Sequence, residues 1–479
     1  MRYSFKPVTY SLKLFQRHLF APVDIACLVY FRVVFGAVMF WEVCRYFNRD
    51  WIGSYWITPK FNFNYAGFEW VSPLPGLLMY WHFALLGVLA ILIAVGWFYR
   101  VSMLLFSLGF IYIFLLEPAR YLNHFYLICL ISGLMIFLPA HRAFSIDSLQ
   151  SPRLRSHVAP AWTLWLLRFQ IAVPYFFGGI AKLNGDWLRG QPMGLWLSES
   201  MDFPLIGSFF DRAWMVYLLS YSGLLLDLFI VPFLLWKRTR WAAFGIATIF
   251  HLTNARLFSI GIFPWFMIAA TALFFEPDWP RRFLKWVFRG KSTASADLTR
   301  YVEFGQRGLS DRQKGIAAAI AIYMVVQCVL PLRHYLYPGN VNWTEEGHRF
   351  AWHMKLRDKD AKAEFFVRDP SSGWVERVEP EVFLTSWQAR KMAARPDMVL
   401  QFCHYLATQF PTVDGQPVEV RARVMASLNG RSPQLLIDPS VDLVQVDLSY
   451  LPSSWIIPLT TPLSPLKKEV MAKVTTVLD

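Results

Sequence analysis

The chain has 479 residues, of which 55% are hydrophobic and 17% aromatic, and its mean hydropathy is positive. Only 17% of its residues are charged, whereas soluble domains typically carry about 25%. The net charge of +14 could suggest a nucleic-acid partner. However, the Lys and Arg residues lie mainly in short segments between apolar runs, as membrane topology requires. The composition therefore predicts an integral membrane protein embedded in a lipid bilayer, with no nucleic acid as partner.

Nine apolar runs approach the length of about 20 residues that a membrane-spanning helix needs. They are 25–43, 76–98, 101–116, 124–140, 161–181, 214–236, 241–257, 260–276 and 315–332. We therefore expect a polytopic α-helical membrane bundle of about nine spans, which makes residues 25–332 the transmembrane helical catalytic domain.

The basic residues predict the orientation of the bundle. Residues 1–24 are basic, and the first apolar run is too long for a cleavable signal and lacks a cleavage site. Cytoplasmic loops carry the excess of Lys and Arg, and here that excess falls on the side of the N-terminus. We therefore expect 1–24 to be a cytoplasmic basic segment. An odd number of spans then places residues 333–479 outside the cytoplasm.

The C-terminal part of the sequence predicts a β-rich domain. Residues 363–368, 418–426 and 441–448 alternate apolar and polar side chains between turn-forming dipeptides, which is typical of strands. One or two helices are expected, within 387–410. The polar stretch 291–314 is expected to be a cytoplasmic linker.

The cysteines and histidines show no metal-binding spacing. The five cysteines form no CxxC pair, and small-hydrophobe packing explains most of them. The histidines form neither HExxH nor the closely spaced pairs of membrane di-iron enzymes. We expect no disulfide framework and no metal.

Ionisable residues inside membrane spans are costly and usually face a partner or a cavity. Those in or next to the predicted spans are Arg32, His82, His124, Arg168, Lys182, Asp227 and His251. Each has a structural explanation. Lys182 could extend to the lipid headgroups, and Arg32 could form an ion pair with Asp227. His82 could form its hydrogen bonds within the helical bundle.

The topology favours a functional role for three of these residues. Asn123 and His124 begin the fourth span at its outer end, and Lys182 ends the fifth on the same side. His251 and Asn254 are three residues apart, so they share a helix face near the outer end of the seventh span. An amine and two imidazoles are thus expected at one membrane depth.

The residues around Lys182 predict its chemistry. Gly178 and Gly179 permit a neighbouring helix to approach closely. Among Phe176, Phe177 and other apolar side chains, desolvation favours the neutral amine, which could act as a base. This requires that no carboxylate, such as that of the nearby Asp186, pairs with the lysine.

Several segments together resemble the vitamin K-dependent gamma-glutamyl carboxylases, which are endoplasmic-reticulum enzymes in animals with bacterial homologues. The resemblance runs from Arg32 to about Pro458. Its segments are YFFGGIAKLNGDW at 175–187, HLTNARLFSIGI at 251–262, LNHFY at 122–126, HRAFSID at 141–147, LLLDL at 224–228, NWT at 342–344 with Trp352, and IDPSVDLV at 437–444.

The resemblance implies a coupled reaction. Reduced vitamin K, as phylloquinone or menaquinone hydroquinone, is deprotonated and reacts with O2 to give a strong base. That base removes the gamma proton of a glutamate in a protein or peptide, and the carbanion adds CO2 to give gamma-carboxyglutamate, while vitamin K leaves as its epoxide. Such a reaction needs a site that excludes water, as a cavity in a helical bundle would.

The resemblance also implies residue roles. Lys182 matches the lysine that deprotonates the hydroquinone, and Asn123, His124 and His251 match the other functional residues. We expect His124 and His251 to be catalytic and to bind the cofactor with Asn123, Asn254 and Lys182. Trp343 and Trp352 fall in the segment expected to bind the substrate.

The sequence departs from the animal enzymes at two places. The lysine before the catalytic one is Ala181 here. No cysteine lies within 45–75, and Cys403 is two places before Tyr405, which holds the position of the family's cysteine, so the interdomain disulfide is absent. We expect a bacterial inner-membrane enzyme. The alternatives are a quinol epoxidase, a carboxylase of a non-protein acid, and a non-enzymatic membrane homologue.

Overall fold

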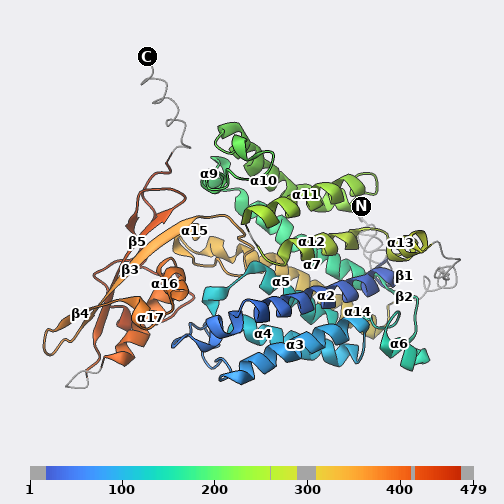
Figure 1. The fold of residues 1–479 in the computed structure, drawn as a ribbon, viewed down its shortest axis with the longest axis horizontal. Coiled ribbons are helices and arrows are strands. Elements are labelled where there is room, and N and C mark those ends of the chain that lie inside the picture. The colour runs from blue at the N-terminus through green and yellow to red at the C-terminus, as the bar shows by residue number, and fades with distance from the viewer. Residues whose placement is uncertain (1–17, 259, 289–308, 411–415, 465–479) are drawn as a thin grey trace, which may run out of the picture.

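The computed structural model describes residues 18–258, 260–288, 309–410 and 416–464, and most of these residues are helical. The long helices run side by side as a bundle, and a sheet-containing C-terminal region lies at one end of it (Figure 1). The strands β1 and β2 and helix α13 lie at the opposite end (Figure 1). The predicted segments 1–17 and 291–308 fall outside the described residues.

Each of the nine predicted runs forms a helix. They are α2 (Ala26–Asn48), α3 (Leu77–Val95), α4 (Tyr99–Leu115), α5 (Asn123–Met135), α7 (Ala161–Lys182), α10 (Ala213–Leu235), α11 (Arg240–Phe258), α12 (Phe263–Thr271) and α14 (Asp311–Val329). Among the residues that the structure describes, five stretches are long and apolar enough to cross a membrane: Ala26–Asn48, Leu77–Val95, Ala161–Lys182, Ala213–Leu235 and Asp311–Leu336. Helices α4, α5 and the stretch Phe263–Phe274 are apolar but shorter. The count of nine spans therefore stays a prediction.

Short elements connect the long helices. They are β1 (Pro22–Asp24), α6 (Ile146–Gln150), β2 (Val158–Pro160), α8 (Gly185–Leu188), α9 (Met193–Ser198) and α13 (Trp279–Val287). Strands β1 and β2 pair in antiparallel register with Val23 opposite Ala159. The Asp24 carboxylate accepts hydrogen bonds from Arg281 at 3.0 Å, which fixes the start of α13 to this pair.

Three ionisable residues of the bundle, the buried Arg32 and Arg168 and the half-buried His82, form hydrogen bonds with backbone carbonyls. The Arg32 guanidinium donates to the carbonyls of Ala140 and Ala143, at 2.8 and 3.3 Å. The expected pair of Arg32 with Asp227 is therefore wrong. Arg168 donates to two carbonyls beyond α12 at 2.7 Å, and His82 Nε2 meets the Gly109 carbonyl at 3.0 Å. The interpretation of His82 as a satisfied bundle histidine is confirmed.

The C-terminal region contains a four-stranded antiparallel sheet in the order β4-β3-β5-β6. Its elements are α15 (Val341–Thr344), β3 (Lys359–Arg368), β4 (Val375–Val378), α16 (Ser386–Ala393), α17 (Pro396–Gln409), β5 (Glu419–Leu428) and β6 (Gln434–Leu435). Buried residues alternate along β5, as the sequence predicted. They form a separate core with α16 and α17, which includes Cys403.

One local prediction in this region is confirmed and one needs correction. The one or two helices expected within 387–410 are two, α16 and α17, because Pro396 follows a residue with extended backbone and starts a new helix. The strand expected at 441–448 is wrong. There, the Asp442 carboxylate accepts the backbone N–H groups of Val420 and Val444 at 3.0 and 3.1 Å, which stabilises a short 3-10 turn instead.

The loop between α4 and α5 docks onto the C-terminal region through a buried carboxylate. Glu117 is 2% exposed and accepts hydrogen bonds from the backbone of Ala119 at 3.0 Å and from Gln388 Nε2 at 3.0 Å. Burial raises the pKa of the Glu117 carboxyl to about 7. Gln388 belongs to α16, so this contact connects the bundle to the C-terminal region.

We expect Glu117→Gln to remove part of the pH dependence of stability. The folded chain holds one extra proton at Glu117 from about pH 4.5 to about pH 7, so the free energy of unfolding falls as the pH rises through that window and is level above it. Thermal unfolding of both proteins in detergent at about pH 5 and about pH 8 measures this effect. The exposed Glu376→Gln is the control. Equal pH dependence in wild type and Glu117→Gln would contradict the prediction.

Candidate functional site

A pocket lies between α7, α10 and α11 at the end of the bundle next to the C-terminal region. Its volume is about 120 Å³, and most of its lining is apolar. The polar side chains that line it from these helices include Lys182, Asp227, His251 and Asn254. The residues Met354 and Lys355, which precede β3, contribute to its wall, so the C-terminal region closes one side of the pocket.

A close approach of α7 and α10 brings Lys182 to Asp227. A Cβ atom at Gly179 would lie 2.8 Å from the Leu228 side chain and 3.0 Å from the Leu228 backbone nitrogen. At Gly178, it would lie 3.4 Å from Asp227 Oδ2. The distances at Gly179 leave no room for a Cβ atom, so the predicted close approach of a neighbouring helix is confirmed at this residue of the Gly178–Gly179 pair.

The Lys182 amine is buried and paired. Its Nζ atom donates to Asp227 Oδ2 at 2.6 Å and to the Gly178 carbonyl at 3.3 Å, and the residue is 6% exposed. The alternative, in which Lys182 extends to the lipid headgroups, is therefore wrong. So is the expectation of an amine without a carboxylate partner. Asp186, the partner that the sequence suggested, instead binds Arg431.

His251 is held by a tyrosine that the sequence analysis missed. The Tyr175 hydroxyl lies 2.6 Å from His251 Nε2 and 3.3 Å from Thr271 Oγ1. Tyr175 and Lys182 are seven residues apart on α7, two helical turns, so both can face the same pocket. This seven-residue spacing is the feature of the sequence that could have identified Tyr175 as part of the site.

Two of the predicted cofactor-binding residues, Asn123 and His124, lie outside the pocket lining. The His124 ring stacks on Phe263 at 5.5 Å, and the Phe263 ring meets His251 edge-on at 6.1 Å. Phe263 lines the pocket and therefore stands between the two imidazoles. Asn123 faces the C-terminal region, because its Nδ2 donates to the His353 carbonyl at 3.0 Å and its Oδ1 accepts the Tyr121 hydroxyl at 3.0 Å.

The two predicted tryptophans are both buried. Trp352 is 1% exposed and packs on Tyr126 with ring centroids 5.0 Å apart. It precedes the pocket residue Met354 by two positions. Trp343 lies in the core of the C-terminal region, where its Nε1 donates to the Ile457 carbonyl at 2.7 Å.

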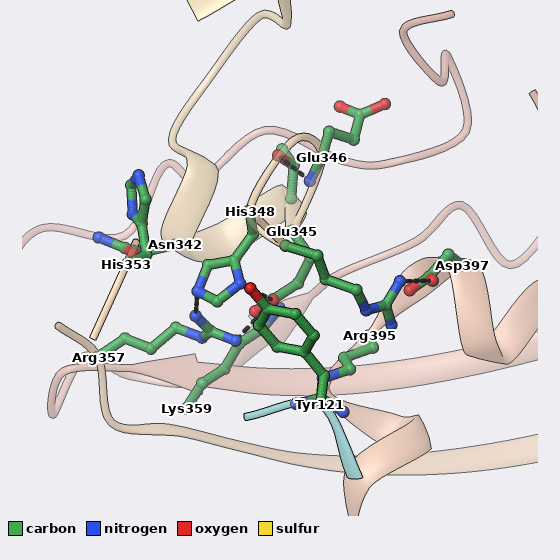
Figure 2. A network of polar contacts seen from close by, with 12 residues as sticks. Tyr121, Asn342, Glu345, Glu346, His348, His353, Arg357, Lys359, Arg395 and Asp397 are labelled. Atoms are coloured by element: carbon green, nitrogen blue, oxygen red, sulfur yellow. Dashed lines mark hydrogen bonds and ion pairs between the residues drawn. The ribbon is translucent and has the colours of Figure 1, made fainter. Parts of the chain in front are cut away.

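A buried ionic network fixes the segment between these tryptophans and β3 (Figure 2). Arg357 bonds Glu345 Oε2 at 2.6 Å and also contacts His348 (Figure 2). Lys359 donates to the Trp343 carbonyl at 2.6 Å and lies 3.6 Å from Glu345 Oε1. Burial lowers the pKa of Lys359 to about 8 and holds that of His348 well below its usual value. The network gives the wall of the pocket a rigid support.

His353 is a further residue that the sequence analysis missed. It is 5% exposed, and among the described residues its two ring nitrogens have no hydrogen-bond partner. Burial lowers its pKa to about 3, so its imidazole is neutral near pH 7. It directly precedes the pocket residue Met354. The sequence feature that could have identified His353 is its position in the segment 334–353, which also contains His334 and His348.

Comparison with known families agrees with this architecture. Residues 20–279 match the HTTM domain, and residues 312–462 match the vitamin K-dependent gamma-carboxylase lumenal domain. No solved structure matches the chain. The fold and the first match define an integral membrane protein of the HTTM-domain class. With the lumenal domain after it, the chain belongs to the vitamin K-dependent gamma-carboxylase family.

Proposed function

We propose that the protein carboxylates glutamate side chains of a protein or peptide to gamma-carboxyglutamate, at the expense of vitamin K hydroquinone, O2 and CO2, and releases the vitamin K epoxide. The observation that carries this proposal is the buried Lys182–Asp227 pair beside His251 in an apolar pocket. The hydroquinone supplies the reducing electrons and, with O2, the strong base of this reaction.

The pocket suits such a molecule. Pro174, Leu257 and Phe263 offer apolar surface to a flat aromatic ring, whereas Lys182 and His251 offer polar atoms to its oxygens. The Met354 segment excludes water from one side. The lining therefore fits an apolar ring with hydroxyl groups.

The Lys182–Asp227 pair can take up a proton although Lys182 is ion-paired with a carboxylate. A proton shared over 2.6 Å can rest on Asp227 Oδ2, which leaves Lys182 Nζ neutral and able to accept a hydroxyl proton. Asn254 lines the same pocket and can orient a substrate oxygen. We assign proton uptake to Lys182, proton storage to Asp227, and binding of the second oxygen to His251. His124 supports this site from the far side of Phe263, and Asn123 supports it through its hydrogen bond to the His353 carbonyl of the C-terminal region.

The activity can be tested directly. The purified protein is incubated with reduced vitamin K, labelled CO2 and a Glu-containing peptide, and both acid-stable label and epoxide are measured. Label in gamma-carboxyglutamate supports the proposal. Epoxide without label would favour a quinol epoxidase. Neither product, in protein that keeps Lys182, would refute both activities.

The proposed topology follows from the charge distribution. The N-terminus and segment 1–24 lie in the cytoplasm, nine helices cross the membrane within 25–332, and residues 333–479 lie outside, at a bacterial inner membrane. The excess of basic residues on the N-terminal side supports this orientation. Trp343 and Trp352 are placed in the substrate-binding segment of the outer region.

We expect Tyr175→Phe to slow hydroquinone oxidation by about tenfold, because His251 loses the hydrogen bond that fixes its ring. Since a positioning effect acts through His251, the pH profile of kcat should also change. Rates and profiles of epoxide formation measure both. Tyr30→Phe, which removes a hydroxyl bonded to the Ala269 carbonyl away from the pocket, is the control. An unchanged rate and profile in Tyr175→Phe would contradict this role.

A further inference from the structure

Helix α13, at the end of the bundle opposite the C-terminal region, turns apolar side chains away from the protein (Figure 1). On the side toward the protein, Arg281 bonds the Asp24 carboxylate at 3.0 Å, and the partly buried Lys285 follows four residues later on the same face. The exposed apolar side chains are those of Phe283, Leu284, Trp286, Val287 and Phe288. Surface helices of water-soluble proteins have the opposite arrangement. The outer face of α13 therefore fits an amphipathic environment and not water alone.

A row of aromatic rings joins α13 to the start of α11. Trp241 packs on Phe275 with ring centroids 4.5 Å apart, and Phe275 meets Trp279 at 6.3 Å. The row continues through Phe283 to Trp286, with steps of 6.3 and 6.1 Å. Trp241 and Trp286, at its two ends, are 74% and 78% exposed. Trp side chains gather where hydrocarbon meets the lipid headgroups, because the ring has an apolar body and a polar N–H group.

Cations accompany this row of rings. Glu276 binds both Arg240 at 2.6 Å and Arg282 at 3.5 Å, so the turn before α11 lies beside α13. The segments 236–241 and 276–288 together contain six Lys and Arg residues but two carboxylates. Three of these cations have no carboxylate partner among the described residues: Lys237, Arg238 and Lys285. The surface therefore carries positive charge that the protein itself leaves unpaired.

This combination of exposed aromatic rings and unpaired cations is complementary to an anionic phospholipid. A helix with Trp, Phe and Leu on one side and Lys or Arg on the other typically lies in the plane of the membrane interface. In the proposed topology, this end of the bundle meets the cytoplasmic leaflet, whose anionic lipids attract Lys and Arg residues at the surface. A neutral lipid matches only the apolar part of the surface, and a soluble anion matches only the charged part.

We propose that α13 and the turn 236–240 form a binding site for an anionic phospholipid of this leaflet. Helix α13 lies in the plane of the interface with Trp286 among the upper segments of the acyl chains. Lys237, Arg238 and Lys285 contact the lipid phosphate. The site is separate from the Lys182–His251 pocket, and it does not depend on the proposed carboxylation.

The test is photolabelling of the full-length protein in nanodiscs. The probe is a phosphatidylglycerol that carries a diazirine in its acyl chain, and labelled peptides are identified by mass spectrometry. We expect label on residues 279–288. Excess unlabelled phosphatidylglycerol should remove this label at least about fivefold more effectively than excess phosphatidylcholine, the factor that one Lys or Arg contributes near an anionic membrane surface.

Two results of this experiment would overturn the proposal. Equal competition by the two lipids would show that the site does not recognise the anionic headgroup. Absence of label on α13, in a sample where the exposed helix α14 is labelled, would show that protein covers this face. The covering protein would then be residues 289–308 or a second copy of the chain.

Two variants separate the charged part of the site from the apolar part. The triple variant Lys237→Gln, Arg238→Gln and Lys285→Gln should lose the preference for phosphatidylglycerol, whereas Trp286→Ser should lower labelling by diazirine analogues of both lipids. The matched control replaces three exposed cations of the C-terminal region with Gln: Lys362, Arg390 and Arg423. It should label as wild type does. A wild-type preference in the triple variant, or unchanged labelling in Trp286→Ser, would overturn the proposal.

Discussion

Lys182→Met should lower hydroquinone-dependent epoxidation and carboxylation together by at least about 100-fold near neutral pH, the usual minimum contribution of a positioned general base. The pocket would then lack the group that accepts the hydroxyl proton. Strongly alkaline medium should restore part of the activity, because it ionises the hydroquinone without the lysine. Initial rates of both products across pH measure this.

A control must separate lost chemistry from lost folding. Lys182→Met leaves the Asp227 carboxylate buried and unpaired, a change that costs about 3–5 kcal/mol in typical proteins. The double variant Lys182→Met with Asp227→Leu removes the pair and should recover stability but not activity. The exposed Lys362→Met should behave as wild type. Neutral-pH turnover in a folded Lys182→Met protein would exclude this lysine from the mechanism.

Arg431→Met should destabilise the protein by about 3–5 kcal/mol, because it leaves the Asp186 carboxylate buried without its charged partner. Arg431 binds both oxygens of Asp186, at 2.6 and 2.7 Å, and Asn429 donates to Oδ2 at 2.8 Å. Asp186 lies in α8, four residues after Lys182, so the pair ties the turn after Lys182 to the C-terminal region. Thermal unfolding in detergent measures the loss of stability.

A double-mutant cycle tests whether this contact acts as one unit. Asp186→Asn and Arg431→Met should each destabilise the protein. The double variant should lose less stability than the sum of the losses in the two single variants. Arg423→Met, on the exposed face of strand β5, should stay within about 0.5 kcal/mol of wild type. Additive losses would show that the two side chains are independent.

The sequence predicted the helices well because long apolar runs have few alternatives in a bilayer. Each of the nine runs forms a helix, yet within the described part of the chain five of these helices have the length and apolarity of a membrane span. The strand at β5 followed from its alternation. The turn at Asp442 did not, because a single side chain that bonds two backbone N–H groups outweighs a weak alternating pattern.

The candidate site was predicted in part. Lys182, His251 and Asn254 meet in one pocket as their helix positions predicted. The partner of Lys182 was assigned wrongly, since Asp186 is near in sequence whereas Asp227 is near in space, across a contact between two helices. Spacing along one helix shows which residues share a face. It does not show which residue of another helix comes opposite.

The bare α-carbon at Gly179 has a consequence for mutational scanning. A single added methyl group would meet Leu228 at 2.8 Å and push α7 from α10, and with it the amine from the carboxylate. In a library selected for activity, position 179 should therefore be as intolerant as a chemically reactive position, although it contributes no functional group. A loss of activity caused by steric conflict can be distinguished from the loss of a reactive group by measuring the abundance of every variant as well as its turnover.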